Sequence, residues 1–167
     1  LNAYPMLKKW MKDSNDYAII HGYIRTLSGR VRRFDRLTAT YSKYGQKVLN
    51  PLDLWQEYHE NENEYEKAKT AYKYIKNCLN NAKNVQIQAL AASIVNKAAI
   101  NATMEFKRQN INARIIMQVH DELVVEAHES CVDRAASILK ACMETSYKLK
   151  LPLTAEPQIA DRYGDTK

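Results

Sequence analysis

Three consecutive polar residues, His120-Asp121-Glu122, interrupt an apolar stretch and are the first candidates for chemistry. The runs Ile115–Val119 and Leu123–Val125 flank them, and their branched side chains favour strands over a helix. Because charge is unfavourable in the middle of a strand, we expect the triplet at the tight turn of a β-hairpin. Such a turn concentrates two carboxylates and an imidazole, and a divalent cation relieves the repulsion between adjacent carboxylates.

An ordinary hairpin with a solvated polar turn explains the same pattern, because polar hairpin turns are common. Read as a whole, however, Gln118-Val119-His120-Asp121-Glu122-Leu123 resembles the third conserved motif of family A, the DNA polymerase I-like DNA polymerases. In that family the motif forms a hairpin of the palm domain, and its Asp binds the catalytic metals.

Two other segments resemble the same family, in the family's order. The first is Tyr4-Pro5 followed by Gly22-Tyr23-Ile24-x-Thr26-Leu27-x-Gly29-Arg30, which is similar to the segment after the nucleotide-gripping helix of the fingers. The second is the run 84–92, which resembles Asn-x-Pro-x-Gln-Gly-x-Ala-Ala, with Gln86 and Ala89 in place of Pro and Gly. The resemblance implies that Asn84 and Gln88 contact DNA near the primer terminus.

The resemblance implies template-directed nucleotidyl transfer with two Mg²⁺ ions, on primer–template DNA and deoxynucleoside triphosphates. Asp121 is the implied metal ligand, and Glu122 a weaker or water-mediated partner. His120 is expected to donate to the terminal phosphate of the primer, and Gln118 to be a supporting polar residue beside the DNA.

Two parts of the family's site have no counterpart in the sequence: the first motif, with the other metal-binding Asp, and the nucleotide-gripping helix. Asp16-Tyr17-Ala18 resembles the Asp-Tyr-Ser of that motif but is not followed by Glu-Leu-Arg, so we assign Asp16 to a helix surface. The chain begins with Leu1, and we expect the C-terminal piece of a longer protein, either a shortened form of it or one part of a split polymerase, that needs an N-terminal piece for activity. The alternative is a non-catalytic nucleic-acid-binding module that keeps the palm hairpin as structure.

The charge balance points to an anionic partner, since 25 Lys and Arg face 19 Asp and Glu, for a net charge of +6. Five arginines follow the first predicted helix, near the aromatic residues Tyr23 and Phe34: Arg25, Arg30, Arg32, Arg33 and Arg36. A solvated basic surface is the simpler interpretation, and contact with DNA phosphates, above all by Arg30 and Arg32, is the functional one.

Cysteine usage and hydropathy indicate the cellular compartment and whether the chain contacts a membrane. The three cysteines include no Cys-x-x-Cys pair, which indicates a reducing, cytoplasmic compartment and no structural zinc. No apolar run approaches the roughly 18 residues that a membrane span needs, and no signal segment opens the chain. We therefore expect no membrane partner.

The order of the expected elements predicts α+β architecture, with helices packed on one face of an antiparallel sheet. The resemblance implies that this sheet is of the palm type and carries the catalytic hairpin. The expected elements are a helix Pro5–His21, a hairpin Tyr23–Phe34, a longest helix Asn84–Lys107 with Ile87 and Ala98 on its apolar face, the His-Asp-Glu hairpin, a helix from about Cys131 and a strand Leu149–Ala155. Residues 1–36 are assigned to the end of the fingers, 37–77 to an insertion-like polar helical segment, and 78–167 to the palm.

Overall fold

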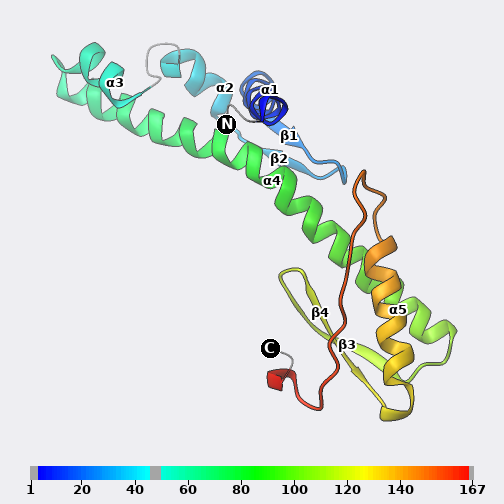
Figure 1. Ribbon diagram of the computed structural model, residues 1–167. Coiled ribbons are helices and arrows are strands. Elements are labelled where there is room, and N and C mark those ends of the chain that lie inside the picture. The colour runs from blue at the N-terminus through cyan, green and yellow to red at the C-terminus, as the bar shows by residue number, and fades with distance from the viewer. Residues whose placement is uncertain (1–3, 46–49, 166–167) are drawn as a thin grey trace. The chain divides into compact units, whose positions relative to one another are not determined.

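The structure is a computed structural model and describes residues 4–45 and 50–165. Its contacts divide the chain into two compact units, Leu1–Leu90 and Ala91–Lys167. The elements, labelled in Figure 1, are α1 Pro5–His21, β1 Tyr23–Arg25, β2 Val31–Arg33, α2 Leu37–Thr40, the π-helix η1 Tyr41–Gly45, α3 Pro51–Tyr58, α4 Glu62–Arg108, β3 Ala113–Val119, β4 Glu122–Ala127, the 3-10 turn η2 Glu129–Cys131, α5 Val132–Thr145 and the 3-10 turn η3 Tyr163–Asp165. None of the helices in the described ranges has both the length and the hydropathy to cross a membrane.

Helix α1 confirms the predicted bounds Pro5–His21, and local chemistry sets both ends. Pro5 occupies the first turn, where its missing N–H costs no hydrogen bond. Gly22 follows the last turn at φ 69°, a left-handed conformation that glycine adopts without a Cβ clash. Its N–H donates to the carbonyl of Ala18 at 2.9 Å, which terminates the helix and directs the chain into β1.

The core of the first unit lies between α1, the β1–β2 hairpin and the middle of α4. Its buried residues are Ala18, Ile24, Phe34, Leu37, Ile75, Cys78 and Ala82. The Gln86 amide nitrogen donates to Ser14 Oγ at 2.9 Å, so a polar bond also joins α4 to α1. Phe34, one of the two aromatic residues near the arginines, is only 6% exposed and belongs to this core.

Helix α4 has 47 residues and starts 22 residues before the predicted start at Asn84. Residues 62–108 include neither Gly nor Pro, so nothing local breaks the helix. Exposed pairs Lys67–Glu64 and Lys69–Glu66 follow the i,i+3 spacing of a helix surface. The predicted apolar face is partly wrong: Ala98 is buried as expected, but Ile87 is 62% exposed.

A second buried cluster covers the segment expected to be an insertion. It joins Tyr44, Leu54, Ala68 and Ala71, from η1, α3 and the first turns of α4. Asn50 begins α3, because its side-chain oxygen accepts from the N–H groups of Leu52 and Asp53 at 2.9 and 3.0 Å. The polar segment is therefore helical and has its own small core.

In the second unit, the β3–β4 hairpin packs with the end of α4 and with α5. The buried residues are Ala102, Phe106, Ala135 and Cys142, and partly buried residues of both strands, such as Ile115 and Val125, pack against them. The helix expected from about Cys131 is confirmed as α5, which starts at Val132.

Two sequence-based expectations about strands are wrong. Residues 149–155 are not a strand, because an alternating run needs a pairing neighbour and Pro152 lacks an N–H. Across the described residues the strands form two separate two-stranded antiparallel sheets, β1–β2 and β3–β4, rather than one larger sheet. The mixture of helices with antiparallel strands is as predicted.

Candidate active site at the β3–β4 turn

The polar triplet lies at the connection between β3 and β4, as the flanking apolar runs predict. Val119 pairs with Glu122, which leaves His120 and Asp121 as a two-residue turn. Glu122 is thus the first residue of β4 rather than part of the turn. The hairpin raises all three side chains to the surface, where each is exposed.

His120 has a backbone conformation that is uncommon for a residue with a side chain. Its φ is 53°, and two-residue hairpin turns with a positive φ at this first central position usually place glycine there. A residue other than glycine pays about 1–2 kcal/mol for left-handed backbone. Replacement by glycine would relieve this strain, so the presence of an imidazole here is itself a reason to look for a function.

Three carboxylates lie on β4 or in the turn before it, and they differ in whether they form a salt bridge. Glu126 accepts from Arg114 across the hairpin, with Nη2–Oε2 at 2.6 Å. Asp121 and Glu122 form no salt bridge within residues 4–45 and 50–165. Asp121 in the turn and Glu122 at the start of β4 are therefore adjacent, exposed carboxylates without a salt-bridge partner among the described residues.

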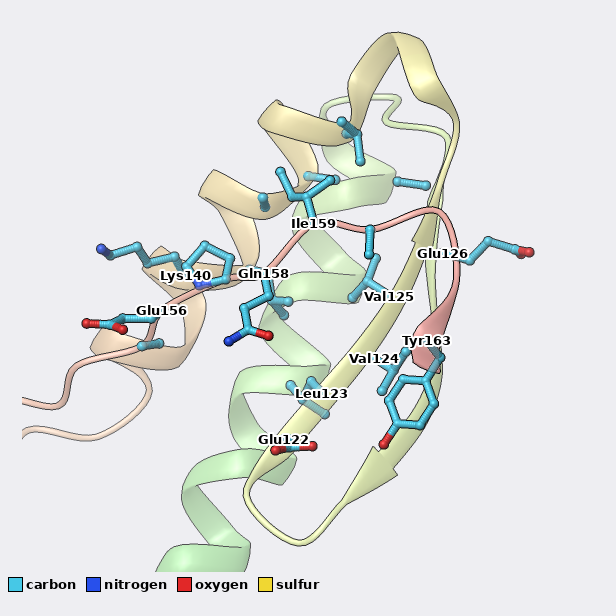
Figure 2. A pocket seen from close by; sticks show the side chains of 18 of the residues that line it. Glu122, Leu123, Val124, Val125, Glu126, Lys140, Glu156, Gln158, Ile159 and Tyr163 are labelled. Atoms are coloured by element: carbon cyan, nitrogen blue, oxygen red, sulfur yellow. The ribbon is translucent and has the colours of Figure 1, made fainter. Parts of the chain in front are cut away.

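A cavity of about 610 Å³ extends along β4 from these carboxylates. Its walls come from β4, α5 and the extended segment 154–163, and Figure 2 shows Leu123, Val125 and Ile159 among its apolar residues. In the same view the Glu126 carboxylate points away from the cavity, as its ion pair with Arg114 requires. Asp121 and Glu122 lie at the turn end of the lining.

Carboxylate oxygens are the ligands that Mg²⁺ prefers, so Asp121 and Glu122 fit a hard divalent cation chemically. They do not complete a site, because the part of the chain that the structure describes contains no group of three or more His, Cys, Asp or Glu that could bind a metal ion. Within the described residues, Asp121 and Glu122 therefore do not make a metal site by themselves.

The other predicted polar residues occupy the surface of separate elements. Gln118 is exposed on β3 and pairs in register with Leu123, two residues from the turn. Asn84 and Gln88 are exposed one turn apart on α4, on one helix face as their spacing predicts, and they belong to the other compact unit.

The five arginines of the β1–β2 region are all exposed, but the register distributes them over different faces. Arg32 pairs with the buried Ile24, so both lie on the core-facing side of the hairpin. Arg25 and Arg33 lie on the opposite face, and Arg30 follows the turn, where its N–H donates to Thr26 Oγ1 at 3.0 Å. The predicted basic hairpin is therefore not one continuous patch.

Sequence reasoning missed one cluster beside these arginines. Tyr17 donates a hydrogen bond from its hydroxyl to the hydroxyl of Tyr23 at 3.1 Å, and the His21 ring lies 4.2 Å from the Tyr17 ring, centroid to centroid. The i,i+4 spacing of Tyr17 and His21 was an available signal, but only the turn at Gly22 brings Tyr23 to them.

Sequence comparison finds relatives over nearly the whole chain. The profile of DNA polymerase family A matches residues 1–165. DNA polymerase I of Deinococcus radiodurans is 28% identical over 165 residues, which cover 99% of this chain and 14% of that protein. DNA polymerase I of Chloroflexus aurantiacus is 25% identical over 163 residues, which cover 97% of this chain and 14% of that protein.

A solved structure shows the same likeness. It is the POL domain of Pol1 from M. smegmatis in complex with DNA primer-template and dNTP, with a TM-score of 0.60 and 26% sequence identity over 87% of this chain and 20% of that chain. The chain spans about one seventh of the length of the two curated relatives. Because the family profile extends over residues 1–165, far more than the hairpin motif alone, the chain belongs to DNA polymerase family A.

Proposed function

We propose that this chain is the C-terminal part of a DNA polymerase that extends a primer as directed by a template, with Asp121 at the reacting centre. The observation that carries the proposal is the β3–β4 turn, where a histidine at positive φ adjoins an exposed carboxylate that has no ion-pair partner among the described residues. The family supplies the reaction class, since the relatives are DNA polymerase I proteins. An uncompensated acid serves a nucleotidyl transferase and hinders a protein that only binds phosphates.

Asp121 is the proposed ligand for Mg²⁺, and Glu122 a weaker partner that acts directly or through water. Two bound Mg²⁺ ions would supply electrostatic stabilisation of the charge that develops on the reacting phosphates. Because the described residues contain no complete metal-binding group, we propose that the other ligands come from polypeptide outside this chain. The β3–β4 hairpin places the Asp121 carboxylate at its turn.

The remaining site residues are proposed to position primer–template DNA. His120 donates from its ring to the terminal phosphate of the primer, and Gln118 supports the same strand from β3. Asn84 and Gln88 present two amides to one groove from successive turns of α4. Arg30 and Arg32 contact phosphates, which fixes the DNA without reading its sequence.

In this proposal residues 1–36 form the end of the fingers, 37–77 an insertion, and 78–167 the palm. An N-terminal piece then binds the deoxynucleoside triphosphate and supplies the remaining metal ligands. The isolated 167 residues therefore do not polymerise. The small share of the relatives' length that the chain spans, 14%, supports this requirement.

Primer extension by this chain, joined to or mixed with the N-terminal part of its polymerase, tests the assignment. Asp121→Asn keeps the size of the side chain and removes its charge. If the interaction supplies several kcal/mol in the transition state, the rate falls by about 10²–10⁴-fold, at tenfold per 1.36 kcal/mol. Glu122→Gln lowers the rate less. Asp16→Asn, the same change at an exposed position of α1, is the matched control and leaves the rate unchanged.

The rates are measured over a series of Mg²⁺ concentrations, with DNA affinity measured in parallel. The catalytic assignment requires that Asp121→Asn binds DNA at least as well as the wild type, because one negative charge near the backbone is gone. An Asp121→Asn protein that extends primers at the wild-type rate would leave the alternative, a non-catalytic nucleic-acid-binding module.

A further inference from the structure

An exposed aromatic cluster joins the end of α1 to the start of β1. The ring of Tyr17 lies 4.2 Å from that of His21 and 5.7 Å from that of Tyr23, centroid to centroid, and the Tyr17 and Tyr23 rings meet edge to face. The two hydroxyl groups are 3.1 Å apart in a hydrogen bond, which fixes the α1 side of the cluster to the strand. Figure 1 shows α1 leading directly into this hairpin.

The strand register adds positive charge to the same face. Alternate residues of a strand share a face, so Tyr23 lies with Arg25, and its cross-strand partner is Arg33. Ile24 points to the opposite face, where it is 5% exposed in the core. The aromatic rings therefore lie beside two exposed guanidinium groups on the solvent side of the hairpin.

The three rings lie at the surface and do not pack in a hydrophobic core. Tyr17 is 38% exposed, His21 is exposed and Tyr23 is half-buried, and none of the three belongs to a hydrophobic cluster of the described residues. The hydrogen bond with Tyr23 raises the pKa of Tyr17, and the nearby charge of Arg25 offsets only part of the rise. The Tyr17 phenol therefore stays neutral at physiological pH and adds no negative charge beside the arginines.

We propose that Tyr17, His21 and Tyr23, with Arg25 and Arg33, form a platform on which unpaired bases of single-stranded DNA stack. Aromatic rings stack on any base, while arginines neutralise the adjoining phosphates. A duplex buries its base faces in its own stack, so this surface prefers single strands. The inference rests on the proposed function for the presence of DNA, and it assigns the unpaired part of the DNA to this face.

Binding of the full chain to two fluorescent 16-nucleotide strands tests the platform. One strand is oligo-dT, and the other has the same length but carries abasic residues in place of the central thymidines. Both strands present the same phosphates, so the ratio of their dissociation constants reports stacking alone. We expect the wild type to prefer oligo-dT by about fivefold or more, the effect of losing one stacked base.

Variants of the cluster assign the preference to these rings. Tyr17→Leu and His21→Ala are expected to bring the ratio close to one, while Tyr17→Phe, which keeps the ring, retains the preference. Tyr4→Leu makes the same change at a tyrosine that is 67% exposed outside the cluster and leaves the ratio unchanged. Since His21 is exposed and lies outside the core, His21→Ala keeps the test valid if Tyr17→Leu destabilises the fold.

The outcomes separate this inference from the proposed function. Equal affinities of the wild type for the two strands, or equal losses in the Tyr4 and Tyr17 variants, overturn the platform while salt-dependent DNA binding persists. Absence of binding to both strands and to duplex overturns the platform together with the DNA-binding part of the proposed function.

Discussion

Replacement of Arg30 and Arg32 by alanine tests whether the β1–β2 hairpin neutralises DNA phosphates. Both side chains are exposed, Arg30 after the turn and Arg32 on β2, so the double variant should fold normally. Arg108 and Arg114 provide a matched control, because they are 69% and 75% exposed but contact Glu105 and Glu126 at 2.7 and 2.6 Å. The control removes the same two charges from positions that are already paired.

The expected magnitude follows from counterion release. Each neutralised phosphate of duplex DNA contributes about −0.9 to the slope of log K against log salt concentration, so two contacts contribute about −1.8. Over a fourfold rise in salt, from about 50 to 200 mM, this slope corresponds to a loss of affinity of roughly 12-fold. The wild type should therefore lose about 12 times more affinity over this range than the Arg30→Ala, Arg32→Ala variant.

Fluorescence anisotropy with a labelled duplex of arbitrary sequence, repeated over the salt series, measures both slopes. The wild type and the Arg108→Ala, Arg114→Ala control should give steep, parallel lines, and the hairpin variant a shallower one. Parallel lines for the wild type and the hairpin variant would refute the reasoning and return these arginines to an ordinary solvated surface. A reduced slope in the control would show instead that the effect is one of net charge.

The other predictions concern stability and reactivity. Because Phe106 is 2% exposed, Phe106→Ala should lower the free energy of unfolding, measured by urea titration, by about 3–5 kcal/mol. The control Ile100→Ala, at a 60% exposed position of α4, should change the free energy of unfolding by no more than about 0.5 kcal/mol. Asn50→Ala should cost about 1 kcal/mol and speed amide exchange at Leu52 and Asp53, and unchanged exchange would contradict the cap. Burial raises the pKa values of Cys78 and Cys142, so iodoacetamide at mildly alkaline pH should modify the half-buried Cys131 first, as peptide mass spectrometry would reveal. Faster modification of Cys142 would indicate that the second unit opens readily.

Local chemistry alone was enough to predict the elements that bear the candidate site. Pro5 and Gly22 delimit α1, because a missing N–H and a left-handed residue act within one helical turn. The two apolar runs that flank His120-Asp121-Glu122 predicted the β3–β4 hairpin for the same reason, since strand preference and turn preference depend on adjacent residues. The absence of Gly and Pro from residues 62–108 was an equally local signal, and it would have predicted the full length of α4.

Tertiary structure decided which side chains are available for chemistry. Glu122 and Glu126 look alike in the sequence, but register places Arg114 opposite Glu126 and removes that carboxylate from the candidate metal ligands. Burial likewise assigns Phe34 to the core, while the turn at Gly22 brings Tyr23 to Tyr17. Residues 149–155 have the alternation of a strand, but no strand in the described part of the chain pairs with them. Propensity acts between neighbours along the chain, whereas pairing and burial depend on residues that only the fold brings together.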